Sequence, residues 1–436
     1  MKKRLLLLIA LVVSVVTTSA QLAPHSNAAL LPQSATTPML AGTAQLLSAA
    51  QGNQTNPHVA CNIATYTYDD FEGSSTIRYF DFATNTEHVV PGNNLDRLSS
   101  TDGQRIAFTE LGIHGDQIFI YDTVSQTTTI VPGDGDFLPA LGGNLVAYVH
   151  GSPFEGGGYE IRVYERDTGT VTQLTNDDMM DRNPAVSPDG KTILWQKCRP
   201  NQIDCDVYSA TQTGPGAFTT RVLTGAGEDT SPDTNGQVIV YLSDKNGGND
   251  VYIQRVDGSN EMHLAIPGDQ RDLRIAGNLV VFESQTLTGW DVFLYDLSTA
   301  RLFQVTNTPG VDETLSDVVA GCDGVNRIVY AVPGSFGDFD AWQFTFQLDD
   351  SVQDQLNDLI ALVQSFNISE GTKASLISKL QDVIAAVNAS DTPKACDSLT
   401  AFSNASQAQS GKKLTAAQVR QLVDAAALIK SDLGCN

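Results

Sequence analysis

Basic residues are scarce in this chain. Its 436 residues include 26 Lys and Arg against 50 Asp and Glu, which gives a formal net charge of −24 at pH 7. Such a chain repels nucleic acid and anionic lipid surfaces, so we expect neither nucleic acid nor membrane insertion. The acidic excess also has a plain explanation, because a high net charge keeps an exported protein soluble.

Long apolar runs are missing too, apart from one near the N-terminus. The run Leu5 to Val16 follows Lys2-Lys3-Arg4 and is followed by small residues that end in Thr18-Ser19-Ala20. This pattern predicts a secretory signal peptide over residues 1–20, and the run is too short to span a bilayer. We therefore expect a soluble, monomeric protein that is secreted or extracellular, or periplasmic if the source has an outer membrane.

Motifs of common catalytic sites are absent from the sequence. It contains no G-x-S-x-G nucleophile elbow, no H-E-x-x-H zinc-protease motif and no glycine-rich phosphate loop. Its six cysteines are an even number in an exported chain, which favours disulfides over catalytic thiols. We therefore expect a protein that is not an enzyme and has no cofactor, with calcium left open.

A repeated pattern occupies most of the chain. It recurs seven times between Asn56 and Phe346, and its fullest copy runs from Gly169 to Tyr208. Short β-runs at a period of about forty residues, separated by Gly and Asp turns, are typical of four-stranded propeller blades. The second strand of each blade is the clearest: Ile63–Tyr66, Arg105–Phe108, Leu145–Tyr148, Thr192–Trp195, Val238–Tyr241, Leu279–Phe282 and Arg327–Tyr330.

The pattern predicts an all-β propeller of seven four-stranded blades over residues 42–348, with six blades as the alternative. No fourth strand follows the last third strand, Ala341–Phe346, but residues 42–48 repeat the outer-strand pattern of Gly169–Thr175. We therefore predict that Ala44–Leu47 closes the ring as the outer strand of blade seven, which removes an exposed sheet edge. The alternative is a short helix or a disordered leader over residues 21–55. In the first interpretation residues 21–41 form a linker.

The repeat resembles that of the TolB-type propellers. The likeness rests on Asp181-Arg-Asn-Pro-Ala-Val-Ser-Pro-Asp-Gly190, on Asp250-Val-Tyr252 and on Val256-Asp-Gly258, and it covers about residues 57–347. TolB itself has six blades preceded by an α/β domain. Too few residues precede the first blade here for that domain, so the resemblance implies the propeller fold and no role in the Tol–Pal envelope system.

The period becomes helical from Asp350 onward. Apolar residues at i, i+3 and i+4 spacing predict a small all-α module of four helices over residues 349–436. Thr392-Pro393 begins the third helix, and Thr415-Ala-Ala-Gln418 is a capping box for the fourth, which ends at Gly434. The stretches Ser365–Gly371, Ala395-Cys396 and Gly411–Gln418 resemble the FIMAH-type helical module, which implies an accessory role in attachment or binding.

Carboxylates recur just before the innermost strands of the blades. In a closed ring these positions converge on one mouth of the central channel, where they would attract a ligand or a cation such as calcium. The alternative is that each Asp caps its own strand. The residues are Asp96, Asp136, Asp181, Asp229, Asp272, Asp312 and Glu313.

A weaker metal site is suggested by two loop histidines in adjacent blades. His114 and His150, with Glu110 and Asp116, lie in or beside loops between second and third strands. A propeller-type polysaccharide lyase uses a comparable His-rich, metal-bearing face. The alternative is that two exposed histidines lie near each other by chance.

The blade register predicts three disulfides. Cys198 ends a second strand and Cys205 begins the third strand of the same blade, so the two face each other across one hairpin. Cys396 and Cys435 lie on the last two helices. Cys61 and Cys322 lie at equivalent turns of blades one and seven, which are neighbours in a closed ring.

These observations favour a secreted, non-catalytic propeller that binds a protein or glycan on one face, with the helical module as a second contact. Propeller faces are built from many loops and suit extended ligands. The alternatives are a propeller-type polysaccharide lyase or other carbohydrate-active enzyme, and a structural envelope or matrix protein. Fold alone does not decide between them.

Overall fold

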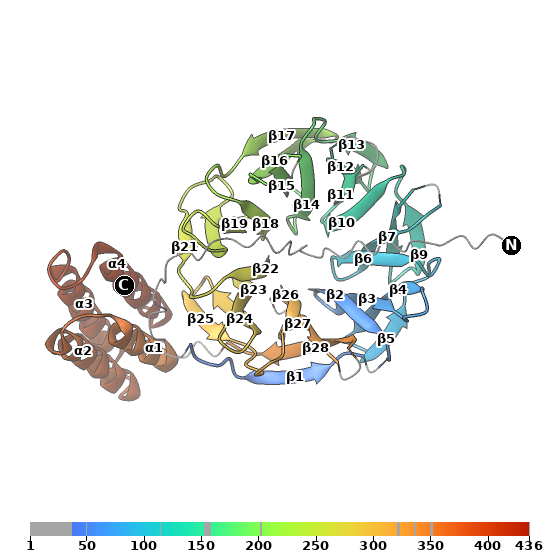
Figure 1. Ribbon diagram of the computed structural model, residues 1–436. Coiled ribbons are helices and arrows are strands. Elements are labelled where there is room, and N and C mark those ends of the chain that lie inside the picture. The colour runs from blue at the N-terminus through green and yellow to red at the C-terminus, as the bar shows by residue number, and fades with distance from the viewer. Residues whose placement is uncertain are drawn as a thin grey trace, which may run out of the picture. The chain divides into compact units, whose positions relative to one another are not determined.

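The chain forms a closed ring of seven β-sheets and a group of four helices (Figure 1). This computed structural model describes residues 37–48, 50–113, 115–151, 158–200, 203–320, 323–334, 337–348 and 352–435. The predicted signal peptide and most of the predicted linker lie outside these ranges. No helix in the described ranges is long and apolar enough to cross a membrane.

Each sheet has four antiparallel strands, numbered from the channel outward as the first to the fourth strand of a blade. Blades 1 to 3 comprise β2 (Asn53–Ala60), β3 (Ile63–Asp69), β4 (Ser75–Asp81), β5 (Thr86–Val89); β6 (Asp96–Thr101), β7 (Arg105–Glu110), β8 (Gln117–Asp122), β9 (Thr127–Ile130); and β10 (Asp136–Gly142), β11 (Leu145–His150), β12 (Glu160–Glu165), β13 (Thr170–Gln173).

Blades 4 to 7 comprise β14 (Met180–Val186), β15 (Thr192–Cys198), β16 (Asp206–Gly214), β17 (Ala217–Val222); β18 (Asp229–Thr234), β19 (Val238–Ser243), β20 (Asp250–Arg255), β21 (Met262–Leu264); β22 (Gln270–Ala276), β23 (Leu279–Gln285), β24 (Trp290–Asp296), β25 (Arg301–Gln304); and β26 (Thr314–Val319), β27 (Asn326–Pro333), β28 (Phe339–Phe346), β1 (Gly42–Leu46). The prediction of seven four-stranded blades is confirmed.

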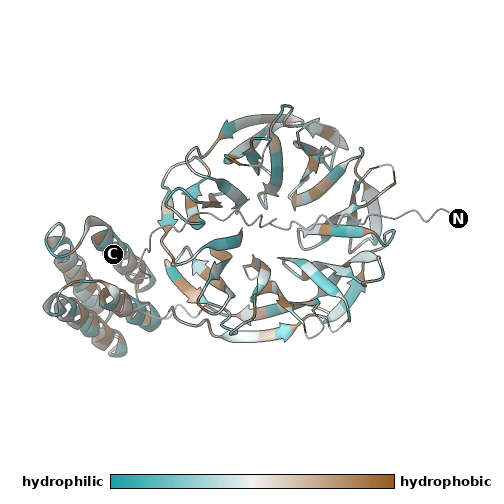
Figure 2. Cartoon of the chain, in the orientation of Figure 1, coloured by the Kyte–Doolittle hydropathy of each residue, from teal (hydrophilic) through white to brown (hydrophobic). Residues whose placement is uncertain are grey.

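The hydrophobic core lies between the faces of adjacent blades. One buried cluster, for example, joins Val240 and Val251 of blade 5 to Leu273 and Phe282 of blade 6. Apolar and polar residues are mixed along the strands, as the hydropathy colouring shows (Figure 2). Every second strand also contributes one buried aromatic ring at an equivalent position: Tyr66, Phe108, Tyr148, Trp195, Tyr241, Phe282 and Tyr330.

All seven innermost strands contain a bulge at the same place. The pairing of the first and second strands shifts register there in every blade. Two residues lie between the shifted pairs in each blade, and the first of the two has a positive φ: Asn56, Leu98, Leu138, Asn183, Ser231, Asp272 and Leu315. Only some of these residue types adopt this conformation readily, so the repetition indicates that the fold requires the bulge.

At the bulge, backbone N–H groups donate hydrogen bonds to side chains of the preceding blade. Leu98 N donates to Thr67 Oγ1 at 3.2 Å, Ser231 N donates to Gln196 Oε1 at 3.2 Å, and Ser316 N donates to Glu283 Oε1 at 3.0 Å. In each case the acceptor belongs to the second strand of the preceding blade. The bulges therefore fasten one blade to the next, because a buried N–H without a partner is costly.

The ring closes as predicted, with β1 as the outer strand of blade 7. Ala44 lies opposite Phe344 in the antiparallel pairing of β1 with β28, and Leu47 N donates to Ala341 O at 2.9 Å. Blades 7 and 1 are further joined by Asp317, which accepts from Val59 N at 3.0 Å and contacts His58 Nδ1 at 3.1 Å.

Residues that precede β1 also form backbone hydrogen bonds with the ring. Leu40 N donates to Gln304 O at 2.8 Å, and Gln304 N donates to Pro38 O at 2.9 Å. Residues 38–40 therefore extend the edge of β25 in blade 6, and Leu40 is buried in the cluster between blades 6 and 7. The segment predicted as the end of a linker thus covers a second sheet edge.

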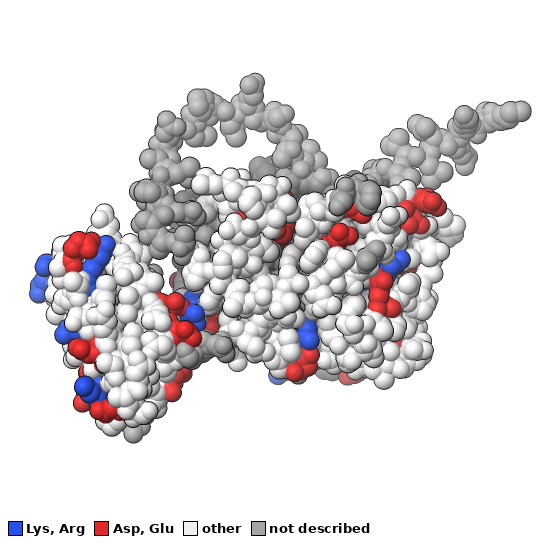
Figure 3. Space-filling model, turned by 90° about the horizontal axis from the view of Figure 1, so that it is seen from below, with Lys and Arg blue, Asp and Glu red and all other residues white. Residues whose placement is uncertain are grey.

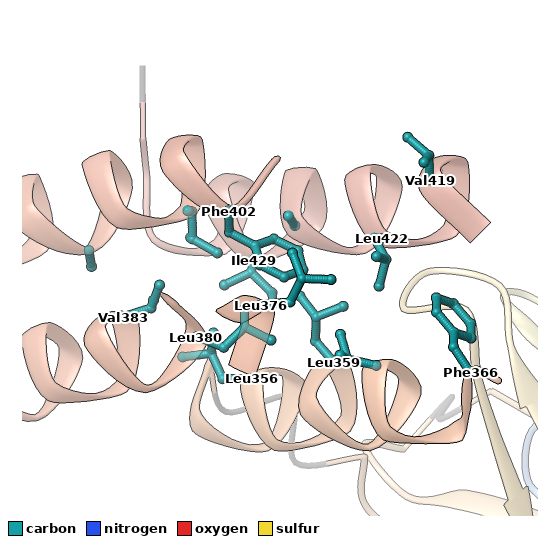
Figure 4. Close-up of a cluster of buried hydrophobic side chains, with 14 of the residues drawn as sticks. Leu356, Leu359, Phe366, Leu376, Leu380, Val383, Phe402, Val419, Leu422 and Ile429 are labelled. Atoms are coloured by element: carbon teal, nitrogen blue, oxygen red, sulfur yellow. The ribbon is translucent and has the colours of Figure 1, made fainter. Parts of the chain in front are cut away.

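The helical module has a hydrophobic core of its own. Its helices are α1 (Val352–Ser365), α2 (Glu370–Asn388), α3 (Thr392–Ala408) and α4 (Ala416–Asp432). Leu359, Leu380, Phe402 and Leu422, one from each helix, belong to a single buried cluster (Figure 4). The predicted capping box is confirmed, because Gln418 N donates to Thr415 Oγ1 at 3.2 Å and Thr415 N donates to Gln418 Oε1 at 2.9 Å.

Two of the three predicted disulfides are present. Cys198 is bonded to Cys205 within blade 4, and Cys396 is bonded to Cys435 within the helical module. Cys61 forms no disulfide with a described cysteine. Cys322 lies outside the described residues, so the Cys61–Cys322 bond stays a prediction that peptide mapping without reduction would check.

Candidate binding face

The two ends of the ring differ in their connections. Because the strands of a blade run antiparallel, one end carries the loops between second and third strands and the connections between blades. We call this end the loop face. The other end, the turn face, carries the turns between first and second strands and between third and fourth strands. The loops on a propeller face are the usual place for binding residues.

The recurring carboxylates begin the innermost strands near the loop face, but their side chains are enclosed. The equivalent position in blades 1 to 7 is held by Gln54, Asp96, Asp136, Asp181, Asp229, Gln270 and Glu313, each at most 2% exposed. Asp272 lies two residues beyond this position, at the bulge, and Asp312 is exposed in the preceding connection. The seven predicted residues therefore do not form one equivalent set.

Hydrogen bonds hold two of these acids, Asp181 and Glu313. Trp195 Nε1 donates to Asp181 Oδ1 at 3.0 Å, and Thr306 Oγ1 donates to Glu313 Oε2 at 3.1 Å. Burial raises the pKa of Asp181 to about 6, and the pKa of Glu313 is raised for the same reason. Such contacts match the strand-capping alternative, in which each acid fixes the start of its own strand.

Burial raises the pKa of two further carboxylates at the equivalent position of other blades. It raises the pKa of Asp96 to about 6, with a smaller contribution from the nearby charge of Glu110. It raises the pKa of Asp229 to about 6 as well, while hydrogen bonds from Ser243 and Thr224 act in the opposite direction. Perturbed acids are candidates for function only where a ligand can reach them. Both side chains are enclosed in the ring.

Three of the four predicted metal ligands, Glu110, Asp116 and His150, lie in the described residues. His150 Nδ1 lies 2.8 Å from Asp136 Oδ1, so this histidine contacts a strand-capping acid. Glu110 is paired in register with Asp96, and the Asp116 carbonyl accepts from Asp136 N. His114 lies outside the described residues. Within the described ranges no three His, Cys, Asp or Glu residues are placed to hold a metal ion, and calcium binding stays a prediction.

Exposed apolar side chains mark the loop face. Among the described connections between strands of the ring, five large hydrophobic residues are exposed on the loop face and one on the turn face. Ile113 and Leu287 project most, at 96% and 88% exposure, and the turn-face residue is Val124 at 78%. The loop-face residues are Phe71, Leu95, Ile113, Ile203 and Leu287.

These residues were not predicted from the sequence, because each is a single apolar residue in a polar loop. The signal was present in Leu111-Gly-Ile113 and in Thr286-Leu-Thr-Gly289, where an aliphatic side chain lies beside glycine. Isolated surface hydrophobics are common, so the sequence alone gave no reason to select them. Their placement on one face became visible only once the strand order was known.

A hollow of about 430 Å³ lies beside two of the exposed residues, Leu95 and Ile113. Its other apolar wall is Leu111, and polar residues complete it. Leu111 N donates to Leu95 O at 3.1 Å, and Asn93 Nδ2 donates to Leu111 O at 3.1 Å, so the connection and the loop are tied together. The lining residues are Asn93, Leu95, Leu111, Gly112, Ile113, Gly115, Gln117 and Asp134.

Solved structures with the same propeller fold belong to several kinds of protein. The β-propeller domain of the trilobed protease from Pyrococcus furiosus matches with a TM-score of 0.53 at 13% identity, over 68% of this chain and 96% of that one. An oligogalacturonate lyase in complex with manganese matches with a TM-score of 0.52 at 12% identity, over 71% of this chain and 94% of that one. At such identities the likeness shows the fold alone.

An acylaminoacyl peptidase from Pyrococcus horikoshii matches with a TM-score of 0.51 at 11% identity, over 69% of this chain and 52% of that one. This chain thus spans about half the length of that peptidase. The trilobed-protease propeller is described as having an open velcro topology, whereas here β1 pairs with β28 and closes the ring.

The seven-bladed ring has the propeller fold that the TolB-type resemblance implies. A TolB structure from Acinetobacter baumannii is among the matches, with a TM-score of 0.40 at 14% identity, over 68% of this chain and 79% of that one, and this match carries no argument. No protein-family model matches this chain, and no curated protein matches it. The FIMAH-type resemblance of the helical module therefore stays a prediction.

Proposed function

We propose that this protein is a secreted, non-catalytic propeller that binds a protein or glycan on its loop face, with the helical module as a second contact. The observation that carries this proposal is the five-to-one distribution of exposed hydrophobic residues between the loop face and the turn face. Apolar side chains held in water on one face are characteristic of interaction surfaces.

The enclosed acids support a role without catalysis. A catalytic acid must touch its substrate, whereas the perturbed carboxylates Asp96, Asp181 and Asp229 are fully enclosed. Each is accounted for by its position at the start of an innermost strand. Residues of the loops would then bind the ligand, and the enclosed acids would pack inside the blades.

Export is supported by two independent features. The N-terminal sequence has the charge, apolar run and small residues of a secretory signal peptide. The disulfides Cys198–Cys205 and Cys396–Cys435 are of a kind that persists in oxidising compartments.

Charged groups are mixed on the side shown in Figure 3, where basic side chains lie beside acidic ones. We also propose that the protein is a monomer.

Arrays of glycans and of extracellular proteins, probed with the full-length chain, test this function. We expect a ligand whose signal is lost when Phe71 and Leu287 are both replaced by Asp. The matched control is Val124→Asp, which places the same charge on the turn face and should leave the signal unchanged. Absence of any ligand, or equal loss in the control, would contradict the proposal.

A further inference from the structure

The hollow beside Ile113 is built on a rigid base. Gly115 has a φ of +125°, and a Cβ atom there would lie 3.0 Å from Gly135 N. The loop of Ile113 therefore packs closely against the connection that follows blade 2, and Gly115 N donates to Gly112 O at 3.4 Å. These backbone contacts lie beside Ile113, whose side chain is exposed.

A second loop extends the apolar surface toward blade 1. Ser75 N donates to Asn94 O at 2.9 Å, so the loop that ends at Ser75 lies against the connection that precedes Asp96. This loop presents Phe71, which is exposed and has a φ of 64°. Asp70 orders the loop by accepting from Glu72 N at 2.9 Å and from Ser74 N at 3.0 Å.

Acidic side chains surround this apolar surface. Asp134 lines the hollow, and Glu110 and Asp116 flank the loop of Ile113. Asp70 and Glu72 flank Phe71 in the neighbouring loop. Five carboxylates in these described segments are not enclosed, and Arg97 is the one basic residue there. A partner that neutralises them must be cationic.

The apolar residues also select the kind of partner. The hollow is lined by the aliphatic Leu95, Leu111 and Ile113, and the aromatic ring of the surface, Phe71, does not line it, so a sugar in the hollow meets no flat ring on which to stack. An open hollow beside a projecting side chain is typical of a docking surface, whereas small-molecule sites enclose most of their ligand. Hydrophobic anchors inside a charged rim are the usual arrangement of protein interfaces.

We propose that the surface formed by Phe71, Leu95, Leu111 and Ile113, with its acidic rim, docks a basic segment of a partner protein that inserts an apolar side chain into the hollow. This inference rests on the proposed function and narrows it to one site and one partner chemistry. Affinity is divided between the apolar anchor and the charged rim.

A random 12-residue peptide library displayed on phage, selected against the immobilised full-length protein, tests the site. We expect the selected peptides to carry excess Lys and Arg around an aliphatic or aromatic residue. Synthetic copies should bind Ile113→Asp at least about tenfold more weakly, the loss typical of one interface anchor. Asp134→Lys should weaken them several-fold, and higher salt should reduce binding to the wild type.

Two control variants separate this inference from the broader function. Val124→Asp on the turn face should leave the peptide affinities unchanged, and Leu287→Asp tests whether the peptides bind elsewhere on the loop face. Peptides without a basic excess, failure to select any, or equal binding to Ile113→Asp would overturn the inference. Loss of binding in Leu287→Asp but not in Ile113→Asp would keep the loop-face function and reject this site.

Discussion

Buried acids at the start of the innermost strands dominate the chemistry at the scale of single residues. An Asp with a pKa of about 6 in the fold, against about 3.9 in an unfolded chain, is disfavoured when ionised by about 3 kcal/mol. The folded state therefore binds the proton more tightly than the unfolded state. The stabilising effect of this proton is complete below pH 4 and is lost as pH rises through 6.

Replacement of Asp96 by Asn should reveal this effect. The amide keeps the shape without the charge, so we expect the variant to gain about 1–3 kcal/mol of stability at pH 7.5 and little at about pH 3. Thermal unfolding at both pH values measures the difference. A variant destabilised equally at both would contradict the account.

Asp70 provides a control of opposite sign. Hydrogen bonds from the backbone of Ser74 and Glu72 hold its pKa below the usual value, so its contribution is present above pH 4 and lost as pH falls through the folded pKa. Asp70→Asn should therefore lose stability at pH 7.5 and change little at low pH.

The positions of the strand-capping acids could be predicted from the sequence, but their exposure could not. Asp96, Asp136, Asp181 and Asp229 each precede a recognisable strand, and that signal is local. Whether a side chain faces a channel or the next blade depends on the packing of two sheets. Asp272 was misplaced because Gln270 holds the equivalent position, and a polar amide at that site carries no acidic signal.

At the scale of elements, the bulge of the innermost strand is the unit that joins one blade to the next. Its N–H groups are accepted by side chains of the preceding blade, such as Thr67 for Leu98. The acceptors differ in chemistry among blades, being threonine, glutamine and glutamate. A sequence pattern based on residue type does not detect such a variable contact, and so the bulges were not predicted.

Replacement of Thr67 by Val tests this joint. The change keeps the volume and removes the acceptor of Leu98 N, so we expect a loss of about 1–3 kcal/mol in the free energy of unfolding. Thr129→Val on β9 is the matched control, because Thr129 is exposed on an outer strand. Denaturant unfolding of the three proteins measures the effect, and equal stabilities would show that water satisfies the N–H group.

At the scale of the whole molecule, the number of blades and the closure of the ring followed from the sequence because both depend on repetition. Residues 42–48 repeat the sequence pattern of Gly169–Thr175, and this repetition identified β1 as the missing outer strand. The proposed binding face did not follow, because it arises from loops whose sequences differ from blade to blade. Its apolar residues share a location and no motif.

Assays on polysaccharide and peptide panels test the absence of catalysis. We expect no hydrolysis or elimination product from the purified protein, because its perturbed acids are enclosed. Metal-dependent product release that is abolished by His150→Ala would contradict this expectation and favour a lyase. His150→Ala is otherwise expected to affect stability, since His150 contacts the buried Asp136.

Hydrogen exchange of the full-length protein, with and without the ligand found on the arrays, tests the central claim that the loop face binds. Binding should slow exchange in loop-face segments, above all residues 70–75, 93–95 and 111–113, and leave the turns at 82–85 and 123–126 unchanged. Protection confined to the turn face, to the outer strands or to the helical module would contradict the account.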